Sequence, residues 1–332
     1  MVGAAPVAVT GLVGELLPTV RAFAIPMPVK FRGTTLREGA LLQGPAGWGE
    51  FSPFPEYGPQ ECARWLACTL EAAAIGWPAP VRRSVPVNVT VPAVGPDQAR
   101  EIVARSGCRT AKVKVAEPGQ PGRADVARVE AVRDAIGPDG KVRVDANGGW
   151  DLDEAQRMLT ELGRFGLEYA EQPCATLDDL AQLRRRVGVP LAADESIRRA
   201  EDPMKVRAAG AADIVVLKTQ PLGGVAPALQ IAEACGLPVV VSSAVDTSVG
   251  LAAGVALAAA LPELPHACGL ATMSLLAGDV TADPLAEVNG ELPVRPAVVD
   301  LDALARYEVD PAGWRDRILA AAAFLPGPTR RQ

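Results

Sequence analysis

Five short stretches decide the fold: TAKVKV (residues 110–115), VRVDANGGW (142–150), EYAEQP (168–173), LAADES (191–196) and DIVVLKTQ (213–220). Each contains a brief apolar run with a charged residue at or near its carboxyl end. The segments between them have helical periodicity, and this alternation is typical of parallel βαβ units. We therefore expect parallel strands whose charged ends meet at one edge of the sheet.

The alternation continues outward on both sides of these stretches and repeats about eight times in all. Eight such units predict a closed (β/α) barrel, a modified TIM barrel. The predicted strands cover residues 85–91, 110–115, 142–147, 167–172, 191–195, 213–218, 238–243 and 268–272.

The remaining chain predicts a second unit, since 332 residues exceed the usual size of one compact domain. Residues 1–84 indicate an α+β capping domain with a first strand at residues 7–9 and a helix at 61–75. A tail of about residues 299–332, with a helix at 314–324, is expected to return and complete this unit. Residues 85–298 then form the catalytic barrel.

Composition excludes several classes of protein. Hydrophobic residues make up 49% of the chain and charged residues 22%, which is ordinary globular usage. The net charge of −6 leaves no basic face for nucleic acid or anionic lipid, so we expect small molecules or other subunits as partners. The lysines and acids described below favour a small-molecule carboxylate as the substrate. The apolar run 251–261 is too short to span a membrane and indicates a buried helix.

The 6 scattered cysteines favour reduced thiols in a cytoplasmic protein. Oligomeric state is not predicted.

Three consecutive predicted strands end in an acid: Asp145, Glu171 and Asp194. A single acid at such a position more often caps a helix or pairs with an arginine. Three carboxylates at adjacent strand ends repel one another and need either raised pKa values or a cation among them. Oxygen ligands without His or Cys favour Mg²⁺, with Mn²⁺ able to substitute. Asn147 and Glu195 lie close enough in sequence to orient these ligands.

Lysines accompany the acids on the neighbouring strands. Lys112 and Lys114 point to the same side of the second strand, and Lys218 ends the sixth. Paired lysines usually mark a solvated face, but the outer face of a barrel strand is covered by helices. A nearby divalent ion and a second ammonium should lower a lysine pKa toward the range of a base. A cation could then stabilise charge on a carboxylate that loses its α-proton.

This set of residues resembles the enolase superfamily, whose lysine base and Mg²⁺ are a known pattern. The resemblance spans nearly the whole chain. It implies that Asp145, Glu171 and Asp194 bind Mg²⁺, while Lys114 and Lys218 lie on opposite faces of the substrate. It also implies that loops of the capping domain close the site.

Two opposed lysines without a histidine on the seventh strand resemble the muconate-lactonizing subgroup. We interpret His266, before the last strand, as structural. The eighth strand lacks the Asp-x-Asp pattern of the dipeptide epimerases, and REGALLQ (37–43), GWGEFSP (47–53) and GLATMSLLAGDV (269–280) resemble dehydratases of the subgroup. The resemblance implies a syn elimination of water from a cyclohexadiene carboxylate with a succinyl side chain. Lys114 would move the proton, and Lys218 would stay cationic.

The sequence is less specific about which residues contact the rest of the substrate. Ser242 and Ser243 could hold the succinyl carboxylate, although ordinary turn formation explains them equally well. Phe51, Phe54 and Tyr57 could close over the substrate from the cap, or they could pack the two domains together.

Two other functions remain open. A racemase acting on N-succinylamino acids needs the same metal and the same opposed lysines, but both lysines must then exchange protons. A barrel that only binds is a different class, and the intact set of two lysines and three acids argues against it.

Overall fold

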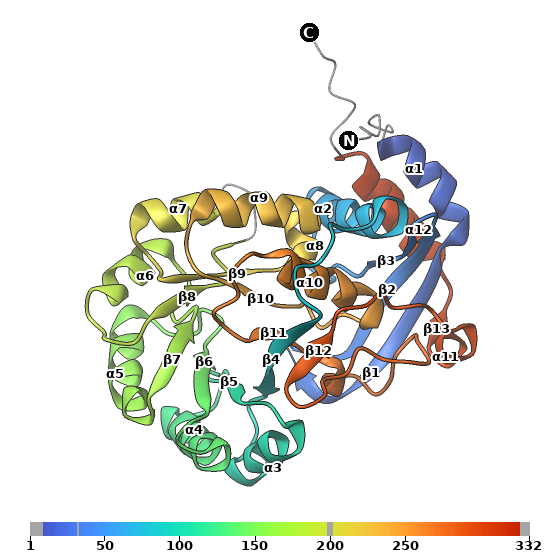
Figure 1. Cartoon of the computed structure of the whole chain (residues 1–332). Helices are drawn as coiled ribbons and strands as arrows, with labels where there is room; N and C mark the ends of the chain where they lie inside the picture. The colour runs from blue at the N-terminus through green and yellow to red at the C-terminus, as the bar shows by residue number, and fades with distance from the viewer. Residues whose placement is uncertain (1–8, 32, 198–201, 326–332) are drawn as a thin grey trace.

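The computed structural model describes residues 9–31, 33–197 and 202–325. Residues 1–8 and 326–332, which the sequence assigns to the capping domain, lie outside this part. The chain forms a barrel beside a smaller α+β unit (Figure 1).

The barrel contains eight parallel strands within the described residues, in the order β10-β9-β8-β7-β6-β5-β4-β11. An isolated bridge between Ser242 and Gly269 joins the two ends of this order and closes the ring. The predicted barrel is therefore confirmed, and its strands are β4 (Ser84–Val91), β5 (Thr110–Lys114), β6 (Lys141–Asp145), β7 (Leu167–Glu171), β8 (Leu191–Ala193), β9 (Ile214–Leu217), β10 (Val239–Val241) and β11 (Cys268–Ala271).

Helices cover the outside of the barrel (Figure 1). Local signals begin two of them as the sequence predicts, because Asp151 accepts a hydrogen bond from the Glu154 amide and Thr176 from the Asp179 amide. The helices are α3 (Pro96–Ser106), α4 (Gly122–Ile136), α5 (Leu152–Leu162) with the short η3 (Gly163–Phe165), α6 (Leu177–Arg184), α7 (Asp202–Ala209), α8 (Thr219–Leu222), α9 (Val225–Cys235) and the buried α10 (Ser248–Ala260).

The capping unit is an antiparallel sheet in the order β13-β1-β2-β3, packed against helices. Its elements are α1 (Val9–Leu16), η1 (Leu17–Thr19), β1 (Arg21–Phe31), β2 (Thr34–Gly44), β3 (Gly47–Phe51), α2 (Pro59–Leu70), the π-helical η2 (Glu71–Ile75), β13 (Glu308–Val309) and α12 (Ala312–Ala322). The connection from the barrel contains η4 (Met273–Leu275), β12 (Glu291–Pro293), which pairs with β4, and α11 (Leu301–Ala305).

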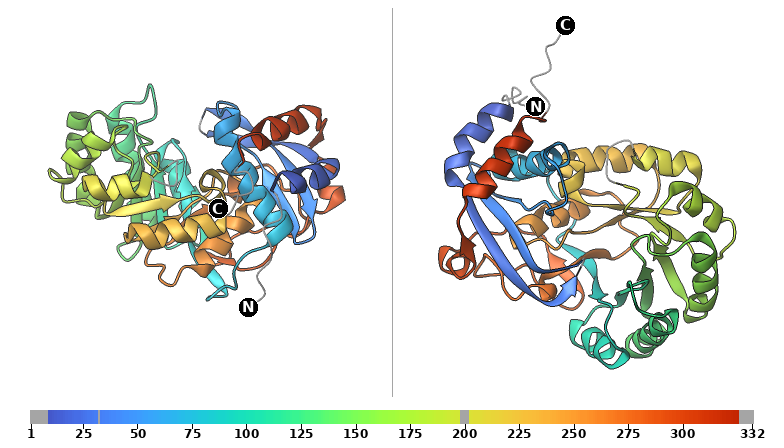
Figure 2. Two further views of the ribbon diagram at one scale, coloured as in Figure 1. Left: turned by 90° about the horizontal axis from the view of Figure 1, so that it is seen from above. Right: turned by 180° about the vertical axis from the view of Figure 1, so that it is seen from behind.

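The tail returns to the capping unit as expected. β13 pairs with β1, and α12 packs beside α1 and α2 (Figure 2). The strand predicted at residues 7–9 is wrong where the structure describes it, since Val9 begins a helix. Val13 and Leu16, three residues apart, lie on one helical face and are buried in the core of the unit.

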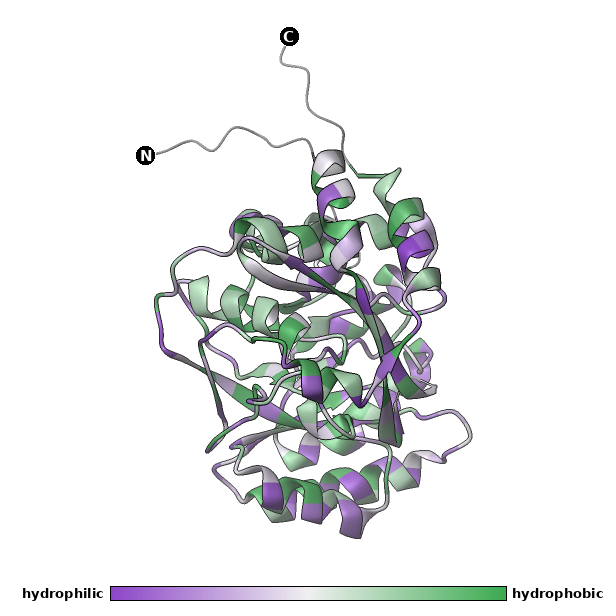
Figure 3. Ribbon diagram, turned by 90° about the vertical axis from the view of Figure 1, so that its right-hand side faces the viewer, coloured by the Kyte–Doolittle hydropathy of each residue, from purple (hydrophilic) through white to green (hydrophobic). Residues whose placement is uncertain are grey.

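Three apolar clusters lie inside the molecule. The first surrounds the barrel strands, and a small third one joins β7, β8, β9 and β10. The second lies between the capping sheet and its helices, with Phe51, Leu66 and Ile318 fully buried. Figure 3 shows hydrophilic and hydrophobic residues interspersed along the side of the molecule formed by the capping unit. Of the helices in the described ranges, none combines the length and apolar character needed to cross a membrane.

Candidate active site

Strand register lines up the charged residues at the carboxyl end of the barrel. Lys114 of β5 lies opposite Asp145 of β6, which lies opposite Glu171 of β7. Because side chains alternate along a strand, Lys112 points to the same side, one layer deeper. The sequence period of two thus places both lysines and two acids inside the barrel.

The lysines of β5 bridge these carboxylates. Lys114 Nζ donates to Asp145 Oδ2 at 2.6 Å and to Asn147 Oδ1 at 2.6 Å. Lys112 Nζ donates to Glu171 Oε1 at 2.8 Å and lies 3.2 Å from Asp145 Oδ2. The ammonium groups therefore occupy positions between carboxylates that would otherwise repel one another.

Lys218 lies directly after β9, across the barrel mouth from Lys114. Three strands separate β5 from β9 in either direction around the ring. Lys218 Nζ donates to Asp194 Oδ1 at 2.7 Å. The structure thus brings together all three predicted lysines and all three predicted acids, with ammonium groups on opposite sides.

The electrostatics of this cluster differ from one group to the next. Although burial favours its neutral form, the ammonium groups of Lys114 and Lys112 hold the pKa of Asp145 well below its usual range. Burial and the negative charge of Asp145 raise the pKa of Glu171 to about 8. Burial disfavours the charged form of Lys112, but Glu171 and Asp145 outweigh it and keep the lysine pKa well above its usual value. Lys112 is therefore a fixed cation rather than a base.

The donor set fits a hard cation. Its three acids supply only oxygen ligands, and Glu171 Oε2 is buried without a hydrogen-bond partner among the described residues. Within the described ranges, no group of three carboxylate, histidine or cysteine side chains is arranged so that it could hold a metal ion. Lysine ammonium groups lie between the acids instead. A cation that joined Asp145, Glu171 and Asp194 would have to displace some of these ammonium contacts.

Asn147 and Glu195 connect the strand ends. Asn147 accepts from Lys114, and its Nδ2 donates to Glu195 Oε1 at 3.0 Å. Sequence reasoning missed Gln172, which follows Glu171 in the quoted EYAEQP stretch. Its Oε1 accepts from the backbone amides of Asp194 (2.9 Å) and Ser196 (3.1 Å), so it fixes the end of β8.

The three lysines, Asp145 and Asp194 line a narrow cavity of about 30 Å³, whereas Glu171 is not among its lining residues. Ser242 and Ser243 lie in its wall together with Ala244 and Val245. Thr90 and Thr272 also line it, and Ser243 Oγ lies 2.9 Å from Thr272 Oγ1. These two threonines were not predicted, because nothing in their local sequence distinguishes them from ordinary strand-end residues.

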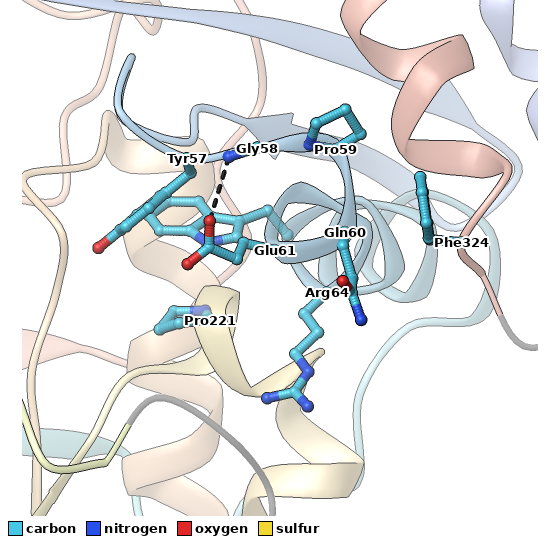
Figure 4. Close-up of a pocket in the computed structure, with 9 residues that line it drawn as sticks. Tyr57, Gly58, Pro59, Gln60, Glu61, Arg64, Pro221 and Phe324 are labelled. Atoms are coloured by element: carbon cyan, nitrogen blue, oxygen red, sulfur yellow. Dashed lines mark hydrogen bonds between the residues drawn. The ribbon is translucent and has the colours of Figure 1, made fainter.

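The aromatic residues of the cap lie elsewhere. Phe51 is fully buried in the capping core, where its ring contacts Trp314 edge-on, so the structure favours a packing role for it over a place above the substrate. Phe54 is buried beneath Arg37. Tyr57 lines a second cavity of about 640 Å³ with Arg64 and Pro221 rather than the lysine and acid cavity (Figure 4). Packing of the aromatic rings against one another stabilises these positions. The sequence of a loop does not show which rings will pack together.

His266 lies beside Glu168 and Tyr169 of β7 rather than beside the lysines and acids of the cavity. Its Nδ1 is 3.1 Å from Glu168 Oε1, and its ring meets that of Tyr169 edge-on. His266 does not line the cavity of the lysines and acids.

Lysines on opposite sides of a barrel mouth, together with three acids, define a class of barrel enzymes. The comparisons with known proteins agree. A family model described as "Enolase C-terminal domain-like" matches residues 96–298, and one described as "Enolase N-terminal domain-like" matches residues 22–73. The chain belongs to the enolase superfamily.

Particular relatives narrow this class. The chain is 70% identical over 316 residues to the o-succinylbenzoate synthase of Thermobifida fusca, covering 93% of this chain and 100% of the relative. It is 55% identical to the o-succinylbenzoate synthase of Mycolicibacterium smegmatis, covering 94% and 97%.

Solved structures share the fold. The 2-chloromuconate cycloisomerase from Rhodococcus opacus has a TM-score of 0.75 at 23% identity, covering 88% of this chain and 98% of that one. The muconate lactonizing enzyme from Pseudomonas putida has a TM-score of 0.73 at 23% identity, covering 87% and 99%.

Proposed function

We propose that this chain is an o-succinylbenzoate synthase. It removes water from 2-succinyl-6-hydroxy-2,4-cyclohexadiene-1-carboxylate to give o-succinylbenzoate, a step of menaquinone biosynthesis. The observation that carries the proposal is the pair of opposed lysines, Lys114 and Lys218, at the mouth that also holds three acids. The named relatives that cover almost the whole chain support the choice of substrate.

Lys114 is the base in this proposal. Its amine takes the proton from the ring carbon that bears the carboxylate and then gives a proton to the departing hydroxyl on the same face. One C–H and one C–O bond break, a ring double bond forms, and water leaves. Asn147 Oδ1 holds the Lys114 amine at 2.6 Å and so fixes its direction.

Lys218 and Lys112 remain cationic. Lys218 faces the opposite side of the flat ring and stabilises the negative charge that develops there. Lys112 neutralises part of the buried negative charge of Glu171 and Asp145.

Asp145, Glu171 and Asp194 would hold Mg²⁺, or Mn²⁺ in its place. When bound, the cation would neutralise the charge that grows on the substrate carboxylate as its α-proton leaves.

The remaining residues bind and enclose the substrate. Ser242 and Ser243, in the cavity wall, would bind the succinyl carboxylate by donating hydrogen bonds from their hydroxyls and neighbouring backbone amides. The six cysteines are buried and free, which agrees with a cytoplasmic enzyme.

A turnover assay tests the proposal. Purified protein should convert the cyclohexadiene substrate to o-succinylbenzoate, a chelator should abolish the conversion, and added Mg²⁺ or Mn²⁺ should restore it. Absence of turnover with Mg²⁺ present would refute the assignment.

A second activity is also favoured by the opposed lysines, because a racemase needs one on each face. We therefore propose N-succinylamino acid racemisation as the alternative. Incorporation of solvent deuterium at the α-carbon of an N-succinylamino acid, measured by NMR, would support it, and no incorporation would exclude it.

A further inference from the structure

A buried polar network joins the capping unit to the cavity wall. Arg37 of β2, Glu50 of β3 and Asp246, in the loop between β10 and α10, are 3%, 2% and 4% exposed. Charged groups are rarely buried this deeply unless they are paired. Some of their partners, such as Ser52, lie in the cap, and others lie in residues 244–250, which no sequence pattern connects to the cap.

Glu50 binds the start of α10. Its Oε2 accepts from the Thr247 amide at 3.1 Å, the Thr247 hydroxyl at 2.5 Å and the Gly250 amide at 3.0 Å. A Cβ at position 250 would lie 2.9 Å from Glu50 Cδ, so the close approach requires glycine there. The carboxylate therefore satisfies amides that the first turn of a helix leaves without partners.

Arg37 binds the loop just before α10. Its Nε donates to the Val245 carbonyl at 2.8 Å, and its Nη2 donates to the Ser52 carbonyl at 2.7 Å. Nη2 also lies 3.7 Å from Asp246 Oδ1. The planar guanidinium thus connects the β10–α10 loop to the capping unit.

The loop itself is strained. Val245 has a φ of +61°, a conformation that costs a β-branched residue about 1–3 kcal/mol and persists only when surrounding contacts enforce it. Arg37 supplies one such contact at the Val245 carbonyl. Asp246 Oδ2 supplies another by accepting from the Ala244 amide at 3.2 Å.

This strained segment is part of the candidate active site. Residues 242–245 line the cavity that also contains Lys218 and Asp194. The network therefore ends directly behind the wall to which the proposed function assigns the succinyl carboxylate.

We propose that Arg37 and Glu50 are positioning residues that hold the β10–α10 loop in its strained, substrate-binding shape. This inference rests on the proposed function for the identity of the substrate. Neither side chain lines the cavity, so both act through the backbone of residues 243–247. The capping unit thereby determines the shape of a wall that belongs to the barrel.

The chain offers a matched control for this role. Glu71, also from the cap, accepts from the Val225 amide at 2.6 Å and the Ala226 amide at 2.9 Å at the start of α9. It joins the two units in the same chemical way, but neither amide lies in the loop that lines the cavity. A Glu71→Gln variant weakens docking of the cap without touching that loop.

The first measurement is backbone hydrogen exchange by mass spectrometry on the full chain. In Glu50→Gln and Arg37→Met, exchange of residues 243–250 should become about tenfold faster or more, while residues 224–231 keep their rates. Glu71→Gln should show the reverse pattern. If Arg37→Met fails to fold, Arg37→Lys, which cannot reach all the acceptors of the guanidinium, replaces it.

The second measurement is steady-state turnover with saturating Mg²⁺. Glu50→Gln and Arg37→Met should raise KM about tenfold while kcat changes less than about threefold, because the wall holds a part of the substrate remote from the reacting carbon. Glu71→Gln should leave KM unchanged at a similar loss of thermal stability.

The outcomes separate the two proposals. Unchanged exchange at residues 243–250, or faster exchange with an unchanged KM, would overturn the positioning role. A wild-type protein without turnover would refute the proposed function instead. Binding of o-succinylbenzoate by calorimetry would then replace KM, and equal affinity in all variants would overturn the inference as well.

Discussion

Lys114 makes two short side-chain contacts at the barrel mouth. It reaches Asp145 and Asn147 at 2.6 Å each, and it lies across the mouth from Lys218. We predict that Lys114→Ala lowers turnover of the cyclohexadiene substrate by a factor of about 10³ or more, since it removes the base. Lys141→Ala is the control and should keep near-normal turnover, because Lys141 lies at the exposed first position of β6, at the end of the strand opposite Asp145. Calorimetry should show that Mg²⁺ still binds, and normal turnover in Lys114→Ala would contradict its role.

Glu50 gives a pH dependence of stability. Burial and the nearby Asp246 carboxylate raise the pKa of Glu50 to about 7, because two buried carboxylates share one guanidinium. Glu50 therefore keeps its proton up to about pH 7 in the folded state, whereas it loses the proton near pH 4.5 in the unfolded state. The contribution of this difference to the unfolding free energy is complete below about pH 4.5 and is lost as pH rises through about 7.

The variant Glu50→Gln should remove this dependence. We predict that the difference in unfolding free energy between wild type and variant is larger at about pH 5 than at about pH 8, by about 1–3 kcal/mol. Urea unfolding at both pH values measures it. A difference that stays constant with pH would show that Glu50 titrates normally.

At the scale of elements, glycines allow cap carboxylates to reach barrel helices. Gly224, just before α9, has a φ of +131°, and a Cβ there would lie 2.4 Å from Glu71 Oε2. We predict that Gly224→Ala lowers the unfolding free energy by about 2–4 kcal/mol through backbone strain and loss of this contact. Urea unfolding is the measurement. Gly163→Ala, at a helical position with room for a Cβ, should change stability by less than about 1 kcal/mol.

The barrel strands could be predicted closely because their signals are local. β5 and β7 begin at the predicted residues 110 and 167 and end within one residue of prediction. Buried runs of β-branched residues between helices carry this information without reference to distant parts of the chain. The start of the chain was harder, since Val9 to Leu16 has apolar residues that fit either period.

The candidate site was predictable to the extent that it follows from strand alternation. Register alone brings Lys114, Asp145 and Glu171 into one row. The place of Phe51 and Tyr57, by contrast, depends on how the capping helices pack. Contacts between segments about 200 residues apart, such as Glu50 with Thr247, leave no local pattern to read.

At the scale of the whole molecule, cation binding should stabilise the fold. The buried acids of β6, β7 and β8 come from separate parts of the chain, so only the folded state gathers them. We predict that millimolar Mg²⁺ raises the Tm by a few degrees, as expected for about 2–3 kcal/mol of linkage at 100 times Kd. Differential scanning calorimetry measures it. Asp194→Asn should lose most of the shift, and an equal shift in that variant would place the ion elsewhere.

The capping sheet is built from both ends of the chain, since β13 pairs with β1. A ribosome makes β1 first and β13 almost 290 residues later. The barrel segment in between can leave the exit tunnel and begin to fold while the sheet still lacks its edge strand. The sheet of the capping unit should therefore be completed only after the barrel segment has been synthesised, which makes this sheet the last part of the molecule to mature.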